Sequence, residues 1–211
     1  MAPLRARRYT PRQIATLDDA RIDESSGLAA SRRYPGHLWT HNDSGDRPRL
    51  FLISPAGKTV AVVNLENANA FDWEDMAIGG TGENAWVYAG DTGDNFRWRS
   101  DISIYRFREP ELDVRRLNQT LHLRAERMVL KYSARQADAE ALAATADGRL
   151  LIATKLDGAS RLWRTPQPFA DGTQQTLEPV GQYSFAQAGE LVTSADLSPD
   201  GRRLALVTYR N

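Results

Sequence analysis

Acidic residues recur at one position of a repeated pattern, and their carboxylate oxygens could hold a cation. Glu24, Glu74 and Glu140 each stand just before a short apolar run, and Asp196 stands before another such run further along the chain. Carboxylates that converge repel one another and are costly to bury without partners. We expect a bound calcium ion, because the available ligands are oxygens rather than thiols. Pairing with arginines or capping of hairpins is the alternative. Three further acids share this location: Asp72, Asp75 and Asp138.

A second acidic feature is a loop sequence that occurs twice. Asp43 and Asp91 each open the pattern Asp-[Ser/Thr]-Gly-Asp, and Asp94 closes the second copy. Such loops form stable turns without any ligand, because an Asp side chain can bond the backbone two residues on. In the functional interpretation, these three aspartates contact a cation or a polar ligand. Neither loop matches the calcium-loop consensus of EF-hands.

Two further side chains are candidates for ligand contact. His41 is the histidine that lies beside acidic residues, but neighbours along a strand point to opposite faces, so a Ser/His/Asp triad is not expected there. Trp98 lies between two arginines in the loop after Asp94, and an exposed Arg-Trp-Arg tip suits recognition of a protein partner or an anionic group. A Trp folded back over the blade edge is the alternative.

Composition excludes several classes of protein. The 211 residues carry 27 basic and 27 acidic side chains, so no overall basic field exists to attract nucleic acid. Cysteine is absent, which removes disulfides, thiolate metal sites and a cysteine nucleophile. No apolar stretch approaches the roughly 20 residues of a membrane helix. Residues 1–12 are predicted to be a flexible segment, and the basic start of the chain has no apolar run behind it, so it does not resemble an export signal.

The elements that would position these residues are short β-strands. Apolar runs of four to seven residues alternate with turn residues, which is typical of an all-β fold. Four units repeat, and repetition at this period favours a β-propeller of four-stranded antiparallel blades. We expect blades at residues 24–65, 72–132 and 138–183, with an incomplete one at 193–211, inside a domain spanning 13–211. The units are aligned on four apolar residues: Leu28, Met76, Leu142 and Leu197.

Three and a half blades do not close a ring of ordinary curvature, because closed propellers carry four to eight. We therefore expect either a fragment of a longer, six-bladed protein or completion by another chain. Residues 13–17 are the candidate for a closing strand. The pairs Asp147-Gly148 and Asp200-Gly201 predict tight hairpins between the first two strands of the last two units.

The chain resembles a group of uncharacterised bacterial β-propeller proteins. The likeness is carried by ESSGLAASRRYPG from Glu24, LWTHNDSG from Leu38, WED from Trp73 and GDTGDN from Gly90. Members commonly have about six blades and an export signal, so the resemblance implies a periplasmic or secreted protein. A looser similarity to calcium-dependent SMP-30-like gluconolactonase propellers implies a metal at an early Glu, here Glu24. The chain is also loosely similar to phytase-like propellers.

Three functions remain open at this point. The leading hypothesis is a calcium-binding propeller that acts as a binding module for a small molecule or a protein. The second is a calcium-dependent hydrolase of lactonase or phosphoester type, in which the metal polarises the substrate. The third is a scaffold whose loop tips contact another protein.

Overall fold

The computed structural model describes residues 12–185 and 189–209, so the predicted flexible segment at residues 1–12 lies almost wholly outside the described part of the chain. The described structure is all-β apart from one 3-10 turn, η1 (Gly82–Asn84). The strands are β1 (Ser25–Ala30), β2 (Leu38–Asn42), β3 (Arg49–Ile53), β4 (Thr59–Leu65), β5 (Trp73–Gly79), β6 (Trp86–Asp91), β7 (Ile102–Arg108), β8 (Gln119–Leu123), β9 (Glu126–Tyr132), β10 (Ala139–Ala144), β11 (Leu150–Thr154), β12 (Ala159–Arg164), β13 (Gln174–Ser184), β14 (Val192–Leu197) and β15 (Leu204–Thr208).

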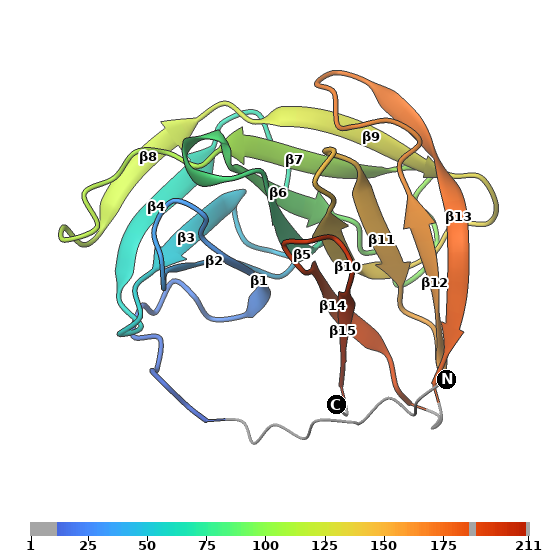
Figure 1. The fold of residues 1–211 in the computed structure, drawn as a ribbon, viewed down its shortest axis with the longest axis horizontal. Helices are drawn as coiled ribbons and strands as arrows, with labels where there is room; N and C mark the ends of the chain where they lie inside the picture. Colours follow the sequence, from blue (N-terminus) through green and yellow to red (C-terminus); the bar gives the residue numbers. More distant parts are fainter. Residues whose placement is uncertain (1–11, 186–188, 210–211) are drawn as a thin grey trace.

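The strands form propeller blades, as the sequence predicts. Three antiparallel four-stranded meanders follow one another, β1-β2-β3-β4, β5-β6-β7-β9 and β10-β11-β12-β13, and β14 pairs with β15. The first strands of successive units pack side by side, and Figure 1 shows β5, β10 and β14 meeting near the centre of the molecule. The predicted hairpins are confirmed, since Gly148 and Gly201 take φ angles of 80° and 67°, which a glycine adopts without strain.

A bulge at the same place in every inner strand fixes the register of the repeat. In the first three units the bulge precedes Leu28, Met76 and Leu142. In β14 it lies between Val192 and Ser194, so the equivalent residue is Ala195. The alignment of the fourth unit on Leu197 is therefore wrong by two residues.

The outer strands of neighbouring blades are joined by parallel pairing. The chain leaves the second blade after β7, adds β8 alongside β4 of the first blade, and returns to form β9. In the same way β13 pairs with β9, so the second and third blades share one continuous sheet. The segment 109–118 is a loop that leads into β8. Figure 1 shows these strands along the outer rim.

A buried aspartate links the inner strands of three units. Asp75 on β5 is fully buried, and its carboxylate accepts hydrogen bonds from the backbone N–H of Leu142 (2.8 Å) and Ala195 (3.0 Å). The Ser194 hydroxyl donates a third bond of 3.1 Å. Burial raises the pKa of Asp75 to about 7, although these hydrogen bonds oppose the shift. Its role is to tie β5 to β10 and β14 rather than to face a ligand.

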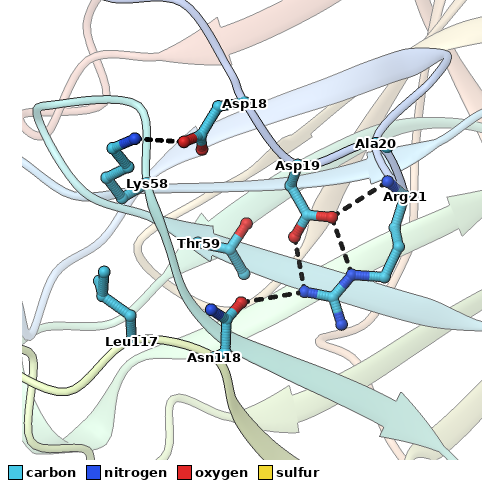
Figure 2. A pocket seen from close by; sticks show the side chains of 8 residues that line it. All are labelled: Asp18, Asp19, Ala20, Arg21, Lys58, Thr59, Leu117 and Asn118. Atoms are coloured by element: carbon cyan, nitrogen blue, oxygen red, sulfur yellow. Dashed lines mark hydrogen bonds and ion pairs between the residues drawn. The ribbon is translucent and has the colours of Figure 1, made fainter.

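The segment before β1 lies against the first blade without forming a strand. Residues 13–17, expected to be a closing strand, have no strand pairing in the structure. Asp18 pairs with Lys58, and Arg21 pairs with Asp19 and also donates to Asn118 Oδ1 (3.2 Å), as Figure 2 shows. The charged side chains in this part of the surface therefore neutralise one another. In the described part of the chain, no helix is long and apolar enough to cross a membrane.

Candidate functional site

Five carboxylates gather where the inner strands of the first three blades begin. One group joins Asp43, Asp72 and Glu74, and a second joins Glu74, Asp138 and Glu140. Within each group the three ligand oxygens lie within 4.8 Å of one another. We call this five-residue set the acidic mouth. Glu74 belongs to both groups and therefore sits at the centre of the site.

The acidic mouth is assembled across blade boundaries. Asp43 follows the second strand of the first blade, whereas Asp72 and Glu74 flank the start of β5. Glu74 and Glu140 stand two residues before the equivalent positions Met76 and Leu142, so the same strand register brings both side chains to the axis. The site therefore depends on how neighbouring blades pack.

A glycine leaves the room that these carboxylates occupy. A Cβ at Gly93 would lie 2.3 Å from Asp72 Oδ2 and 2.4 Å from Glu74 Oε1. Its backbone N–H donates to the Asp72 carbonyl oxygen at 3.1 Å. The loop after β6 thus passes directly against the acidic mouth, and any side chain at this position would displace the oxygens.

The electrostatics of the acidic mouth favour a positive ligand. Burial, reinforced by the charges of Glu140, Asp43 and the other mouth acids, raises the pKa of Glu74 to about 9. Burial and the charge of Asp43 raise the pKa of Asp72 to about 6. Burial also raises the pKa of Glu140, while its contact with Lys155 opposes that shift. Among the described residues, Lys155 is the cation paired with a carboxylate of the mouth, and Arg99, whose charge lowers the pKa of Asp72, is itself paired with Asp91, so charge repulsion persists.

The mouth opens into a cavity of about 500 Å³. Asp43, Asp72, Glu74 and Glu140 line its acidic side. Lys155, Tyr209, Asn95, small hydroxyl residues and the apolar side chains of Leu28 and Val207 line the remainder. Lys155 Nζ lies 5.4 Å from the centre of the Tyr209 ring. The space is sufficient for a hydrated ion or a small polar molecule beside the carboxylates.

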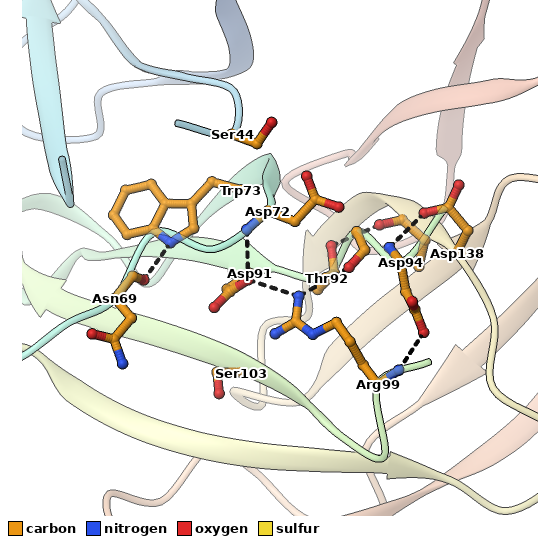
Figure 3. A network of polar contacts seen from close by, with 12 residues as sticks. Ser44, Asn69, Asp72, Trp73, Asp91, Thr92, Asp94, Arg99, Ser103 and Asp138 are labelled. Atoms are coloured by element: carbon orange, nitrogen blue, oxygen red, sulfur yellow. Dashed lines mark hydrogen bonds and ion pairs between the residues drawn. The ribbon is translucent and has the colours of Figure 1, made fainter. Parts of the chain in front are cut away.

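Asp91 and Asp94 do not join the acidic mouth, because other groups occupy their oxygens (Figure 3). Arg99 Nη1 donates to Asp91 Oδ1 at 2.8 Å, and the backbone N–H of Asp72 donates to the same oxygen at 3.0 Å. The Asp94 carboxylate accepts the backbone N–H groups of Trp98 and Arg99 at 2.8 and 2.9 Å. Both aspartates therefore shape the loop after β6, in line with the turn interpretation of the sequence.

Three other candidates also lie outside the acidic mouth. Glu24 is exposed, and neither group of converging carboxylates includes it. Asp196 is exposed on β14, one residue beyond the position equivalent to Leu142, and accepts a hydrogen bond from the backbone N–H of Leu197. His41 is fully buried, with Nδ1 2.8 Å from the Asn42 carbonyl oxygen and its ring against Trp73. Burial lowers the pKa of His41.

Lys155 is the residue of this site that the sequence analysis missed. It directly follows β11, and its backbone N–H donates to the Asp138 carbonyl oxygen at 2.9 Å. A signal was present, because Lys155 is one of only three lysines in a chain that otherwise uses arginine. A lysine here supplies a compact charge to one carboxylate without bridging several of them.

Trp98 is exposed, as the sequence predicts. Its side chain is 80% exposed and stacks on Phe96, with the ring centroids 4.7 Å apart and the planes 24° apart. Phe96 is 72% exposed. The loop after β6 therefore presents an aromatic pair to solvent rather than folding Trp98 back over the blade.

Fold and site together define a class of protein, a β-propeller with an acidic cavity where its inner strands begin. The sequence matches no family model, and a search of curated proteins gives no match. Among solved structures the chain is similar to the β-propeller domain of Cps50 (Swd1) from Myceliophteria thermophila, at 13% identity and a TM-score of 0.45, covering 88% of this chain and 48% of that one. It is also similar to YCF48 in a complex with D1 peptide, at 12% identity and a TM-score of 0.34, covering 93% and 66%. The chain thus spans about half the length of the first of these proteins and about two thirds of the second.

Proposed function

We propose that this propeller is a binding module whose acidic mouth holds a divalent cation, calcium in the first instance. The observation that supports the proposal most directly is the sharing of Glu74 between two groups of converging carboxylates. The donor set consists of hard oxygens, which suits calcium and magnesium better than zinc or copper. Irregular spacing across blade boundaries favours calcium, because magnesium demands near-ideal octahedral geometry.

The raised pKa of Glu74 supports the same proposal. A carboxyl group with a pKa of about 9 is protonated at neutral pH unless a cation compensates the neighbouring charges. A divalent ion between the two groups would reverse this effect and permit all five carboxylates to ionise. Gly93 is consistent with such a site, because it keeps the ligand side of Asp72 and Glu74 free of a side chain.

The resemblance to exported bacterial propellers suggests where such a site would operate. Calcium sites of extracellular modules need only bind with dissociation constants of about 10⁻⁴–10⁻³ M. We propose that the protein works outside the cytoplasm with a site of this strength. The bound ion would then either complete the binding surface of the cavity or contact an anionic ligand there.

Calcium titration of EDTA-treated protein tests the proposal. Calcium at about 100 times its dissociation constant should stabilise the fold by about 2.7 kcal/mol, which raises Tm by about 5–10 °C for a domain of this size. Glu74→Gln should abolish both the calorimetric binding signal and the rise in Tm. Asp196→Asn is the matched control, since it removes an exposed carboxylate outside the acidic mouth. A cooperative melt unaffected by calcium would reject the proposal.

A calcium-dependent hydrolase is the second candidate, and the pKa of Asp72 favours it. A carboxylate with a pKa of about 6 beside a cavity is suited to act as a general base near neutral pH. A panel of lactones and phosphoesters, assayed with calcium, tests this candidate. Turnover that requires calcium and that Asp72→Asn removes while the fold stays intact would establish an enzyme. Absence of turnover on the whole panel would leave the binding module as the function.

A further inference from the structure

A second cavity, of about 280 Å³, lies beside the acidic mouth and has the opposite charge. Three arginines line it, Arg97 from the loop after β6, Arg135 from the β9–β10 connection and Arg161 from β12. Trp163 also lines it. Gln136, Ala137, Thr154 and Leu156 complete the wall, so no carboxylate takes part. We call this cavity the arginine pocket.

The three guanidinium groups are available for a ligand. Across residues 12–185 and 189–209, none of the ion pairs or side-chain hydrogen bonds in the structure involves the guanidinium of Arg97, Arg135 or Arg161. Arg99 and Arg106 are engaged by Asp91 and Glu126. Exposed arginines outside the pocket, such as Arg202 and Arg203, donate only through their backbone, so what sets Arg97, Arg135 and Arg161 apart is that they line one cavity. Three unpaired charges that converge repel one another, and an anion would offset that repulsion.

Trp163 supplies an independent sign of a missing partner. Its side chain is 97% buried, yet its indole Nε1–H has no hydrogen-bond partner among the described residues. A buried donor without an acceptor costs free energy, and an indole nitrogen can only donate. Thr154 accepts a hydrogen bond from the Arg161 backbone N–H at 2.9 Å, which leaves its hydroxyl proton free to donate as well. The arginine, threonine and indole groups of the pocket can thus all donate to an acceptor, and Gln136 can donate or accept.

The loop that carries Arg97 is held in one conformation. Arg97 has a φ of 56°, in the left-handed region that non-glycine residues rarely adopt. Its backbone N–H donates to the Asp94 carbonyl oxygen at 2.8 Å, and the Asp94 carboxylate fixes the next two N–H groups. A backbone so constrained directs the Arg97 side chain from a fixed point before any ligand arrives, which lowers the part of the entropy cost of binding that comes from ordering the loop.

We propose that the arginine pocket binds the phosphate group of a small molecule. Guanidinium groups match the oxygens of phosphate in bidentate pairs, and three of them suit a dianion better than a singly charged carboxylate. The pocket volume fits a small ligand rather than a peptide or a membrane surface. Ala137 directly precedes Asp138 of the acidic mouth, and Thr154 directly precedes Lys155, which contacts Glu140 of the mouth, so the phosphate site and the cation site lie on adjoining backbone.

Calorimetric titration with inorganic phosphate in EDTA tests the proposal independently of calcium. The double variant Arg135→Gln/Arg161→Gln should weaken phosphate binding by at least about a hundredfold, because a hydrogen bond to a charged group accounts for about tenfold or more in affinity. Both side chains are exposed, so the variant should fold normally. Arg202→Gln/Arg203→Gln is the matched control, since it removes two exposed arginines outside the pocket and should leave binding unchanged.

Two further measurements decide the chemistry of the ligand. Acetate at the same ionic strength should bind at least about tenfold more weakly than phosphate, because it carries one charge rather than two. In a ¹⁵N-labelled sample, phosphate should shift one of the five indole N–H signals, the one that Trp163→Phe removes. Equal binding of acetate, an unchanged set of indole signals, or full phosphate affinity in the double variant would each overturn the proposal.

Discussion

Calcium binding at the acidic mouth should release a proton, and its affinity should rise steeply with pH. Glu74 has a pKa of about 9 without an ion, so at pH 7 it is protonated and must lose its proton to become a ligand. The two pKa units between 7 and 9 correspond to about 2.7 kcal/mol. The apparent calcium affinity should therefore increase about tenfold per pH unit well below pH 9, and about fiftyfold from pH 7 to pH 9, where half of the Glu74 side chains are already ionised. Below pH 6 the slope should steepen, because Asp72 then also takes up a proton.

Isothermal titration calorimetry in two buffers of different ionisation enthalpy measures this proton release directly. Wild-type protein should release close to one proton per calcium ion at pH 7 and progressively less towards pH 9 and above. Control titrations with Asp196→Asn should follow the wild type, since Asp196 lies outside the acidic mouth. Affinity that stays constant between pH 7 and 9, with no buffer dependence of the heat, would refute the electrostatic reasoning.

The same pKa values set the pH dependence of stability in the ion-free protein. The folded state holds protons on Glu74 and Asp72 that the unfolded chain has already released, so it binds more protons than the unfolded state. Stability contributed by these groups is therefore greatest below about pH 4 and falls as pH rises towards 9. Calcium should remove most of that fall, because it stabilises the ionised carboxylates.

Two substitutions test how the backbone supports the site. Gly93→Ala places a Cβ against the carboxylates of Asp72 and Glu74. We expect this variant to lose the calcium-induced rise in Tm and to be less stable by about 1–3 kcal/mol. Thermal melts with and without calcium measure both effects. Asp75→Ala leaves three hydrogen-bond donors of the neighbouring blades unpartnered. Urea unfolding should show that the free energy of unfolding falls by about 3 kcal/mol or more. A fall of less than about 1 kcal/mol would show that Asp75 does not hold the three inner strands together.

The blades were predictable because their signals are local. Alternating apolar residues predict strands, and pairs such as Asp147-Gly148 predict the hairpins between them. The parallel pairing of β8 with β4 gave no such signal, since the paired residues, such as Ala61 and Gln119, are 58 positions apart and β8 is a short, largely polar segment. Nothing in five such residues distinguishes a strand at a blade rim from a surface loop.

The acidic mouth was predictable only in part, because neighbours decide what each carboxylate does. Asp43 and Asp91 open the same loop sequence, yet Arg99 occupies Asp91 whereas Asp43 faces other acids. Asp196 was included because its apolar neighbour resembles those of the other units. The correct register of the fourth unit is set by the pairing of its second strand. Thr208 pairs with Val192 in the fourth unit, just as Thr154 pairs with Ala139 in the third unit.

The parallel ladders along the rim affect how this molecule can unfold and how it can have evolved. In a repeat protein whose units touch only their neighbours, the units can melt one after another. Here β8, which follows β7 of the second blade in the sequence, pairs with the edge strand β4 of the first blade. In the same way, β13 of the third blade pairs with the edge strand β9 of the second blade. The first and second blades therefore each need the chain that follows them for a complete set of edge hydrogen bonds, which favours a single cooperative transition and slow folding through distant contacts. A gene duplication or deletion that adds or removes one blade would break such a ladder, so the rim itself constrains the number of blades.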